Sequence, residues 1–550
     1  MDRKRTPVSL IIGIAIAAVA ISIGGFFVYR NSSSKKVMDP YLYFNMTETE
    51  GAVIRDGAVC EEKAVVNGET VYVPYCTVSD LCGNPFYYEE ASETMYLTLQ
   101  NEDNRWTKEN GEYLYFDGGN VCLEAGTLKK YSDCGVSIYT DPLRIVITEQ
   151  YDDVTQAEVL EDTQVRYESS KKSPILRQVA AGETLRYIAD EEPWSRVLTE
   201  DGYTGYILTD KISIGRASDL SRGINPLTDY EKIQVDGKVS MVWNQIEVQE
   251  GNTYLDEMFE GTYGIGVISP TWFRIADTEG NISSLADMAY VENCRNRGVQ
   301  IWALIYDYAG EGSTTGEILK DPDARRNLIS QLMGEVDEYG LDGINIDFET
   351  IAEDEAGAYI QFLRELSVET HRAGIVLSVD DYVPTYTAHY NRACQSKVVD
   401  YIIMMGYDEH TPNSAEPGSV ASLPFVRDGV EATLKEVPAS QLILGVPFYT
   451  RSWTEPLNAG YYETEALSMP RAEDFRAEHQ IEMYWDSAAG QNVGSAVDDQ
   501  ARYSIWMENR ESIEEKLKLA EDYSLAGVSA WRIGYENMDV WETWNAYLNR

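Results

Sequence analysis

A pair of carboxylic acids stands inside an apolar stretch in the middle of the chain. In "LDGINIDFET", residues 341–350, Asp347 and Glu349 lie two positions apart in a segment that alternates like a β-strand. Side chains at positions i and i+2 of a strand face the same side, so Asn345, Asp347 and Glu349 share one face. An ionised carboxylate is costly to bury without a partner, and this face therefore predicts a functional site.

Two neighbouring carboxyl groups suit general acid and base chemistry. Partial burial and a second negative charge both raise the pKa of a carboxyl group, which lets it keep a proton at neutral pH. Two alternatives remain open, a hydrogen-bonded structural cluster in the core and a metal site. A metal site needs further ligands, for which His410 in "GYDEH" is the candidate. We expect neither a metal nor a cofactor.

Eight apolar, strand-like runs alternate with helical stretches after residue 238. The runs cover residues 239–243, 263–269, 299–306, 343–348, 374–379, 399–407, 441–449 and 525–534. This alternation predicts an α/β fold, a (β/α)8 TIM barrel, with Glu349 at the mouth formed by the C-terminal ends of the strands. A doubly wound sheet is the alternative, because periodicity does not show whether a sheet closes. The long gap at 450–524 predicts a small α+β insertion.

Four motifs in residues 238–550 resemble those of glycoside hydrolase family 18. They are "LDGINIDFE", which looks like the pattern DxxDxDxE with Asn345 in place of its second Asp, "MMGYDEH" after the sixth run, "LILGVPFYTRSW" on the seventh and "GVSAWRIGYE" on the eighth. Within the family, the segment is most similar to the peptidoglycan-acting N-acetylglucosaminidases of bacterial spores and envelopes, the cortical fragment-lytic type.

The resemblance implies substrate-assisted hydrolysis, in which the 2-acetamido oxygen of the sugar attacks the anomeric carbon. Glu349 would act as general acid and then as general base. Asp347 would bind the acetamido N–H and stabilise the oxazolinium charge, and Tyr407 would steady the acetamido oxygen. Trp531 would form the apolar floor under the sugar ring, although a plain core position is its alternative.

The same motifs supply further residues that we expect to bind substrate: Asn345, Asp408, Tyr308 and Tyr449. The family pattern has Asp where this chain has Asn345. We expect Asn345 to donate a hydrogen bond to Asp347 and to alter the pH profile without abolishing activity. Asp408 either orients groups at the mouth or caps its loop, and Asp342, with the opposite strand parity, suits a structural role.

Deep sugar subsites would need exposed aromatic side chains. The candidates are Trp243, Trp272, Tyr308, Tyr382, Trp453 and Trp485.

The N-terminus reads as a membrane anchor. "MDRKR" precedes residues 7–29, an uncharged run of 23 residues that is long enough to span a bilayer. By the positive-inside rule the body of the chain lies outside the cell. We expect an uncleaved, single-pass anchor within residues 1–36, and a signal peptide cleaved near "AVA" at 18–20 is the alternative.

Two small β-rich segments and a linker precede the expected barrel. Residues 37–150 contain the hairpin signal Asn67-Gly68 and resemble the copper-amine-oxidase N-terminal-like module, although nothing suggests copper. Residues 154–215 resemble a bacterial Src-homology-3-like barrel, a module that contacts cell-wall peptide or serves as a spacer. The matching residues are Trp194, Val197, Gly202, Gly205 and Tyr206. Residues 216–237 form a turn-rich linker.

The composition of the chain limits the classes of molecule that it is expected to bind. Its 550 residues include 45 basic and 91 acidic side chains, and a formal charge of −46 argues against nucleic acid. Five cysteines fall within 75 residues, namely Cys60, Cys76, Cys82, Cys122 and Cys134. An extracellular setting permits one or two disulfides among them, and free buried thiols are the alternative.

We therefore expect a membrane-anchored, extracellular glycosidase that acts on a polymer containing N-acetylglucosamine, with peptidoglycan ahead of chitin. A chitinase or chitooligosaccharide hydrolase would use the same residues. A non-catalytic glycan-binding scaffold would be signalled by loss of Glu349, which is present.

Overall fold

The computed structural model describes residues 32–81, 83–100, 102–107, 113–149, 151, 153–217, 230–457 and 460–550. The expected membrane anchor at 7–29 lies outside the described residues. Among the residues that are described, no helix combines the length and apolar character needed to cross a bilayer. The chain divides into two compact units. The first unit comprises the residues up to Asn84 together with Trp106–Pro226. The second comprises Pro85–Arg105 and Leu227–Arg550.

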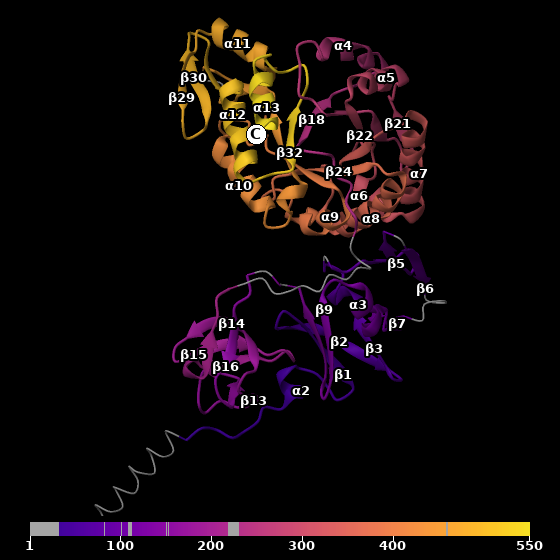
Figure 1. Ribbon diagram of the computed structural model, residues 1–550, viewed down its shortest axis with the longest axis vertical. Coiled ribbons are helices and arrows are strands. Elements are labelled where there is room, and N and C mark those ends of the chain that lie inside the picture. Colours follow the sequence, from indigo (N-terminus) through magenta and orange to yellow (C-terminus); the bar gives the residue numbers. More distant parts are fainter. Residues whose placement is uncertain are drawn as a thin grey trace, which may run out of the picture. The chain divides into compact units, whose positions relative to one another are not determined.

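The first unit contains two seven-stranded sheets (Figure 1). One has the order β7-β8-β3-β2-β1-β10-β9. Its elements are α2 Pro40–Tyr43, β1 Glu50–Arg55, β2 Ala58–Asn67, β3 Thr70–Pro74, η1 Tyr75–Thr77, β7 Leu114–Asp117, β8 Asn120–Glu124, α3 Ala125–Tyr131, β9 Gly135–Thr140 and β10 Leu143–Thr148. The expected Asn67-Gly68 turn joins β2 to β3, with Gly68 in the left-handed region at φ 64°.

The other sheet has the order β13-β12-β16-β15-β14-β11-β17 and lies within the segment that resembles a Src-homology-3-like barrel. Its elements are β11 Gln156–Val159, β12 Thr163–Arg166, β13 Ile175–Val179, β14 Thr184–Glu191, β15 Trp194–Leu198, β16 Thr204–Leu208, η2 Thr209–Lys211 and β17 Ile212–Ile214. Trp194 is buried in its core. A Cβ on Gly205 would lie 2.5 Å from the carbonyl oxygen of Arg166, so the close approach of β12 and β16 requires glycine.

Three of the clustered cysteines are thiols. Cys60, Cys76 and Cys122 form no disulfide in the structure. Burial raises the pKa of each thiol, for Cys122 to about 11, which favours the protonated form at neutral pH.

A small three-stranded sheet interrupts the first unit in sequence. Its strands are β4 Phe86–Glu89, β5 Thr94–Leu99 and β6 Glu102–Thr107. The division of the chain places Pro85–Arg105 with the second unit. The contacts explain this grouping, because Gln361 donates to Thr98 Oγ1 at 2.9 Å and the guanidinium of Arg325 lies 5.6 and 5.4 Å from the rings of Tyr87 and Tyr96.

Eight parallel strands of the second unit close into a barrel (Figure 1). They are β18 Val239–Asn244, β19 Val267–Pro270, β22 Gln300–Tyr306, β23 Gly343–Asp347, β24 Val376–Tyr382, β25 Tyr401–Met405, β26 Leu442–Pro447 and β32 Gly527–Trp531. Each strand pairs in parallel with the next, and the pair β18–β32 closes the ring. The predicted TIM barrel is thus confirmed, and the doubly wound sheet is wrong because its ends would remain unpaired.

Helices and short 3-10 turns follow the strands and cover the barrel. They are η3 Gln249–Tyr254, α4 Leu255–Met258, α5 Met288–Arg297, α6 Thr315–Lys320, α7 Pro322–Tyr339, η4 Glu353–Glu355, α8 Ala356–Ala373, η5 Ala388–Tyr390, α9 Arg392–Val398, α10 Leu423–Thr433, η6 Ala439–Gln441, α12 Arg510–Asp522 and α13 Val540–Leu548. Local sequence sets their ends. In α7, the Asp321 side chain accepts the backbone N–H groups of Asp323 and Ala324, which follow Pro322, and Gly340 ends the helix at φ 63°.

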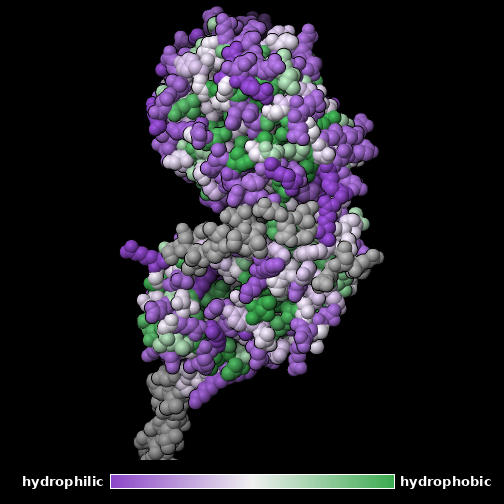
Figure 2. All heavy atoms as spheres, turned by 45° about the vertical axis from the view of Figure 1, so that its right-hand side comes forward, coloured by the Kyte–Doolittle hydropathy of each residue, from purple (hydrophilic) through white to green (hydrophobic). Residues whose placement is uncertain are grey.

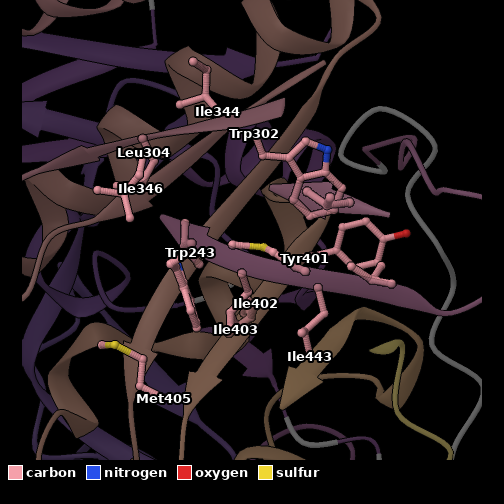
Figure 3. Close-up of a cluster of buried hydrophobic side chains, with 14 of the residues drawn as sticks. Trp243, Trp302, Leu304, Ile344, Ile346, Tyr401, Ile402, Ile403, Met405 and Ile443 are labelled. Atoms are coloured by element: carbon pink, nitrogen blue, oxygen red, sulfur yellow. The ribbon is translucent and has the colours of Figure 1, made fainter. Parts of the chain in front are cut away.

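The barrel is packed rather than hollow. Figure 3 shows part of its core, with buried side chains that come from β18, β22, β23, β25 and β26. Trp302 stacks on Tyr401 with ring centroids 5.5 Å apart. At the start of β23, a Cβ on Gly343 would lie 2.7 Å from the ring of Trp302, so glycine is required there. On the face that Figure 2 shows, the surface of the same unit is mostly hydrophilic.

An insertion separates β26 from β32, as the long gap in the sequence predicts. It is an antiparallel sheet of order β28-β27-β31-β30-β29 with one helix. Its elements are β27 Tyr449–Pro456, β28 Glu463–Ser468, α11 Met469–Glu478, β29 Glu482–Asp486, β30 Gln491–Val497 and β31 Ala501–Met507. A smaller addition, β20 Phe273–Ile275 with β21 Ile282–Ser284, extends the barrel sheet beside β22.

A buried ion pair fastens α12 to the end of the insertion. The side chains of Glu508 and Lys516 are 0% and 1% exposed, and Lys516 Nζ lies 3.0 Å from both carboxylate oxygens. Gln491 and Ser512 also donate to Glu508. The carboxylate is therefore fully partnered only while the lysine is present.

Lys516→Met should lower the free energy of unfolding by about 3–5 kcal/mol, because it leaves the Glu508 charge buried without its cation. The measurement is chemical denaturation of the chain followed by near-ultraviolet circular dichroism. Lys518→Met is the matched control on the same helix, where the lysine is half exposed, and should change stability by no more than about 0.5 kcal/mol. Equal effects of the two variants would contradict a structural role for the buried pair.

Candidate active site

Neighbouring strands hold Glu349 from both sides. The hydroxyl of Tyr382, the last residue of β24, donates to Glu349 Oε2 at 2.8 Å. Asp307 follows β22, and its Oδ2 accepts the backbone N–H groups of Glu349 at 2.8 Å and Thr350 at 3.1 Å. The turn after β23 is therefore fixed at the mouth of the barrel, where Glu349 remains accessible to solvent.

The surroundings of Glu349 favour its protonated form. Loss of water around the side chain raises its pKa, and the negative charges of Asp307 and Asp408 raise it further. The hydrogen bond from Tyr382 acts in the opposite direction. Glu349 thus has both the access and the proton affinity that a general acid needs.

Asp347 holds a proton even more readily. Burial raises the pKa of Asp347 well above its usual range, and the charge of Glu349 adds to this, followed by those of Asp380 and Asp307. Its buried Oδ1 has no hydrogen-bond partner among the described residues. Asp347 and Glu349 therefore behave as one coupled pair that retains a proton.

Asn345 lies at the centre of a buried hydrogen-bond network. Its Oδ1 accepts from Trp243 Nε1 at 3.1 Å and from Ser269 Oγ at 3.0 Å. Its Nδ2 donates to Ser378 Oγ at 3.1 Å and to Asp380 Oδ1 at 2.9 Å. An indole N–H can only donate, which fixes the orientation of the amide.

Asn345 therefore has no N–H left for Asp347. The expected hydrogen bond between the two is wrong, because strand register turns the amide toward β24, where Ser378 is directly opposite Asn345. The carboxylate that Asn345 binds is Asp380.

The predicted residues after β25 and β26 meet on the other side of the mouth. Tyr407 is buried between the rings of Trp243 and Tyr449, with centroids 6.5 and 6.1 Å away. The Tyr449 hydroxyl donates to Asp408 Oδ1, and the guanidinium of Arg451 lies 3.7 Å from the same oxygen. Asp408 thus orients a neighbouring side chain. Burial raises the pKa of both tyrosines well above the usual range, so they remain phenols.

Trp531 ends β32 and is only partly buried, with its ring 6.0 Å from that of Trp243. It lies at the mouth, as predicted. Tyr308 follows Asp307 in the chain, and its partly buried ring packs against the barrel core. Asp342 accepts the backbone N–H of Ile301 at 2.9 Å, which is the structural role expected from its strand parity.

Several expectations about aromatic subsites are wrong. Trp243, Trp272 and Trp453 are each 1% exposed and cannot stack on a sugar. Their indole N–H groups are used inside the protein, for Trp272 by Asn252 and for Trp453 by the carbonyl of Gly418. Tyr382 binds the candidate acid instead, and Trp485 is exposed on β29.

Sequence reasoning missed Asp307, Asp380 and the hydrogen bonds of Trp243. Both aspartates follow apolar strand runs, in "ALIYDY" and "LSVDDY", and this position at the end of a barrel strand was the available signal. Among the described residues, no group of three or more His, Cys, Asp or Glu side chains is arranged to hold a metal ion. His410 Nδ1 instead lies 2.8 Å from the carbonyl oxygen of Ser419.

Comparison with known proteins supports the expected family of the barrel and of the Src-homology-3-like segment. The family profile described as glycosyl hydrolases family 18 matches residues 273–536, and the profile described as bacterial SH3 domain matches residues 161–213. A crystal structure of a chitinase from Chromobacterium violaceum ATCC 12472 shares the fold, with a TM-score of 0.51 and 19% identity over 57% of this chain and 99% of that chain.

Two curated relatives come from Bacillus subtilis (strain 168). The glycosylase YdhD is 28% identical over 271 residues, which cover 48% of this chain and 64% of that protein. The cortical fragment-lytic enzyme is 29% identical over 233 residues, which cover 41% of this chain and 54% of that protein. The chain thus spans less than two thirds of the length of these relatives.

Tyr382→Phe should lower kcat about tenfold, the cost of one hydrogen bond to a charged group. In the intact enzyme the hydrogen bond from Tyr382 lowers the pKa of Glu349. Its removal should therefore raise this pKa and move the alkaline limb of the rate profile to higher pH. The measurement is kcat/KM against pH on a soluble N-acetylglucosamine oligomer. Tyr386→Phe, at an exposed tyrosine four residues on, is the control and should leave both unchanged. An alkaline limb that stays in place would show that Tyr382 does not act on the acid.

Proposed function

We propose that this chain, whose residues 273–536 form a glycoside hydrolase family 18 domain, hydrolyses a glycan that contains N-acetylglucosamine. The observation that carries the proposal is the acid pair at the barrel mouth. Glu349 is accessible, has a raised pKa and is held by Tyr382 and Asp307, while Asp347 lies beside it on the same strand face. A single accessible acid with a buried carboxylate behind it suits substrate-assisted catalysis.

In the first step, Glu349 gives its proton to the glycosidic oxygen as the bond from that oxygen to C1 breaks. The 2-acetamido oxygen of the same sugar bonds to C1 and forms an oxazolinium ion. The pair then holds no proton, and the Asp347 carboxylate accepts the acetamido N–H and stabilises the positive charge. In the second step, water loses a proton to Glu349 and attacks C1, which breaks the bond to the acetamido oxygen and restores the enzyme.

Other residues shape the sugar site. Trp531 offers a partly exposed aromatic face at the end of β32 for stacking under the ring. Tyr407 would steady the acetamido oxygen with a hydroxyl that burial keeps protonated. Asp408 and Tyr449, which are joined by a hydrogen bond, would also bind the sugar, as would Tyr308.

Peptidoglycan is the proposed substrate, ahead of chitin. The bacterial SH3 domain at residues 161–213 is suited to contact wall peptide, and one relative is named for its action on cortical fragments. Residues 7–29 would anchor the chain in the cell membrane with its bulk outside, and residues 37–150 would serve as a spacer module. A chitinase is the second candidate, because the same acid pair and stacking residue would act on chitin.

The test is release of muropeptides from purified peptidoglycan by residues 37–550. Products would be reduced and analysed by mass spectrometry, with chitin oligomers in parallel. We expect N-acetylglucosamine at the new reducing ends, and at least about a 100-fold loss of rate in Glu349→Gln. Glu353→Gln, an exposed glutamate four residues on, is the matched control and should retain full activity.

Two outcomes would change the proposal. Cleavage of chitin oligomers without release from the wall would make the chain a chitinase. Binding to either glycan without any cleavage would make it a glycan-binding scaffold.

A further inference from the structure

Asp380 is a buried carboxylate that the steps above leave without a role. It is 2% exposed and lies on β24, inside the barrel. Its Oδ1 accepts from Asn345 Nδ2 at 2.9 Å. Its Oδ2 accepts from Trp243 Nε1 at 3.2 Å, and this indole N–H is shared with Asn345 Oδ1. Both donors are N–H groups, from β23 and β18, that cannot accept a hydrogen bond.

We propose that Asp380 is a positioning residue that supplies the fixed negative charge behind the acid pair, in place of the acid that the family pattern has at position 345. This inference rests on the proposed function and extends it. The negative charge would thus lie on β24, at Asp380, and not on β23, at position 345. Asn345 connects Asp380 to the rest of the hydrogen-bond network.

The hydrogen bonds decide which carboxyl group carries the charge. A carboxylate whose two oxygens both face N–H donors is stabilised in its ionised form, whereas one without donors is not. Asp380 has two such donors and the buried Oδ1 of Asp347 has none. Asp380 therefore ionises first, and the next proton stays with Asp347 and Glu349.

Burial raises the pKa of all three carboxyl groups, for Asp380 well above the usual range, so the hydrogen bonds set the order. Those from Asn345 and Trp243 act on Asp380 in the opposite direction to burial. The Asp380 charge in turn raises the pKa of Asp347. The titratable groups that interact electrostatically with Asp380 are Asp347 at the end of β23, Glu349 after it, Tyr407 after β25, Tyr359 from α8 and the adjacent Asp381 on β24.

The protons of these three carboxyl groups can then be assigned. One proton is shared between Asp347 and Glu349 in the resting enzyme, and Glu349 gives it to the leaving oxygen. Asp380 neither gains nor loses a proton during turnover. Its charge keeps the shared proton on the pair Asp347 and Glu349 until substrate arrives.

The test is Asp380→Asn, which keeps size and shape but removes the charge. We expect the alkaline limb of kcat/KM to move to lower pH, because Asp347 and Glu349 lose a like charge and release their shared proton more easily. We also expect kcat to fall at least about tenfold.

The decisive variant is the double exchange Asn345→Asp with Asp380→Asn. It restores one carboxylate and one amide to the network and moves the charge back by one strand. We expect it to return the alkaline limb and to recover most of the lost kcat/KM. A double variant no better than Asp380→Asn, whether because it is inactive or because it does not fold, would overturn the proposal, as would an unshifted limb in Asp380→Asn.

Asp381→Asn is the matched control on the same strand. Asp381 faces the other side and lies 3.2 Å from Nε of the buried Arg392. Its loss should lower the melting temperature without moving the alkaline limb. A shift of the limb equal to that in Asp380→Asn would contradict a specific role for Asp380.

A readout without substrate separates this inference from the proposed function. The indole N–H resonance of Trp243, assigned by its absence in Trp243→Phe, reports the charge of Asp380 through their hydrogen bond. We expect it to stay constant across the pH range of the alkaline limb and to shift in Asp380→Asn. A resonance that titrates within that range would show that Asp380 holds the proton, even if the chain proved to cut no glycan.

Discussion

The site depends on one electrostatic constraint: four carboxyl groups gather at one end of a packed barrel and cannot all be ionised. N–H donors decide where the charge resides. Asp307 accepts two backbone N–H groups, and Asp380 accepts an amide and an indole N–H. Asp347 has no donor at its buried oxygen, and Glu349 has only a hydroxyl. Protons therefore collect on the pair that does the chemistry.

The closed barrel is what brings these groups together. Parallel register places Tyr306 beside Asp347, so that Asp307 reaches the turn after β23, and it places Ser378 beside Asn345, so that Asp380 follows one side-chain step later. Trp243 comes from β18, which does not pair with β23, and reaches Asn345 across the interior. An open sheet would not bring this indole to the network.

Much of this arrangement could be predicted from the sequence. The eight apolar runs correspond to the eight strands, since buried parallel strands are continuous in hydrophobicity. Alternation along β23 correctly placed Asn345, Asp347 and Glu349 on one face. The insertion followed from the length of the gap between the last two strands.

The partners of those residues could not be predicted in the same way. Periodicity along one strand gives the direction of a side chain but not what lies across from it. Asn345 was therefore assigned to its neighbour Asp347, whereas register and closure give it to Asp380. For the same reason the sequence offers Trp243 and Trp453 as candidate sugar-stacking residues, although their indoles are buried and form internal hydrogen bonds.

Neutron diffraction from a crystal of residues 37–550 grown in heavy water would test the central claim most directly, because it locates each exchangeable deuteron. The account predicts a deuteron on Asp347 or Glu349 and none on Asp380, with the amide and indole deuterons of Asn345 and Trp243 directed at the Asp380 oxygens. A deuteron on Asp380, with Asp347 and Glu349 both bare, would contradict it.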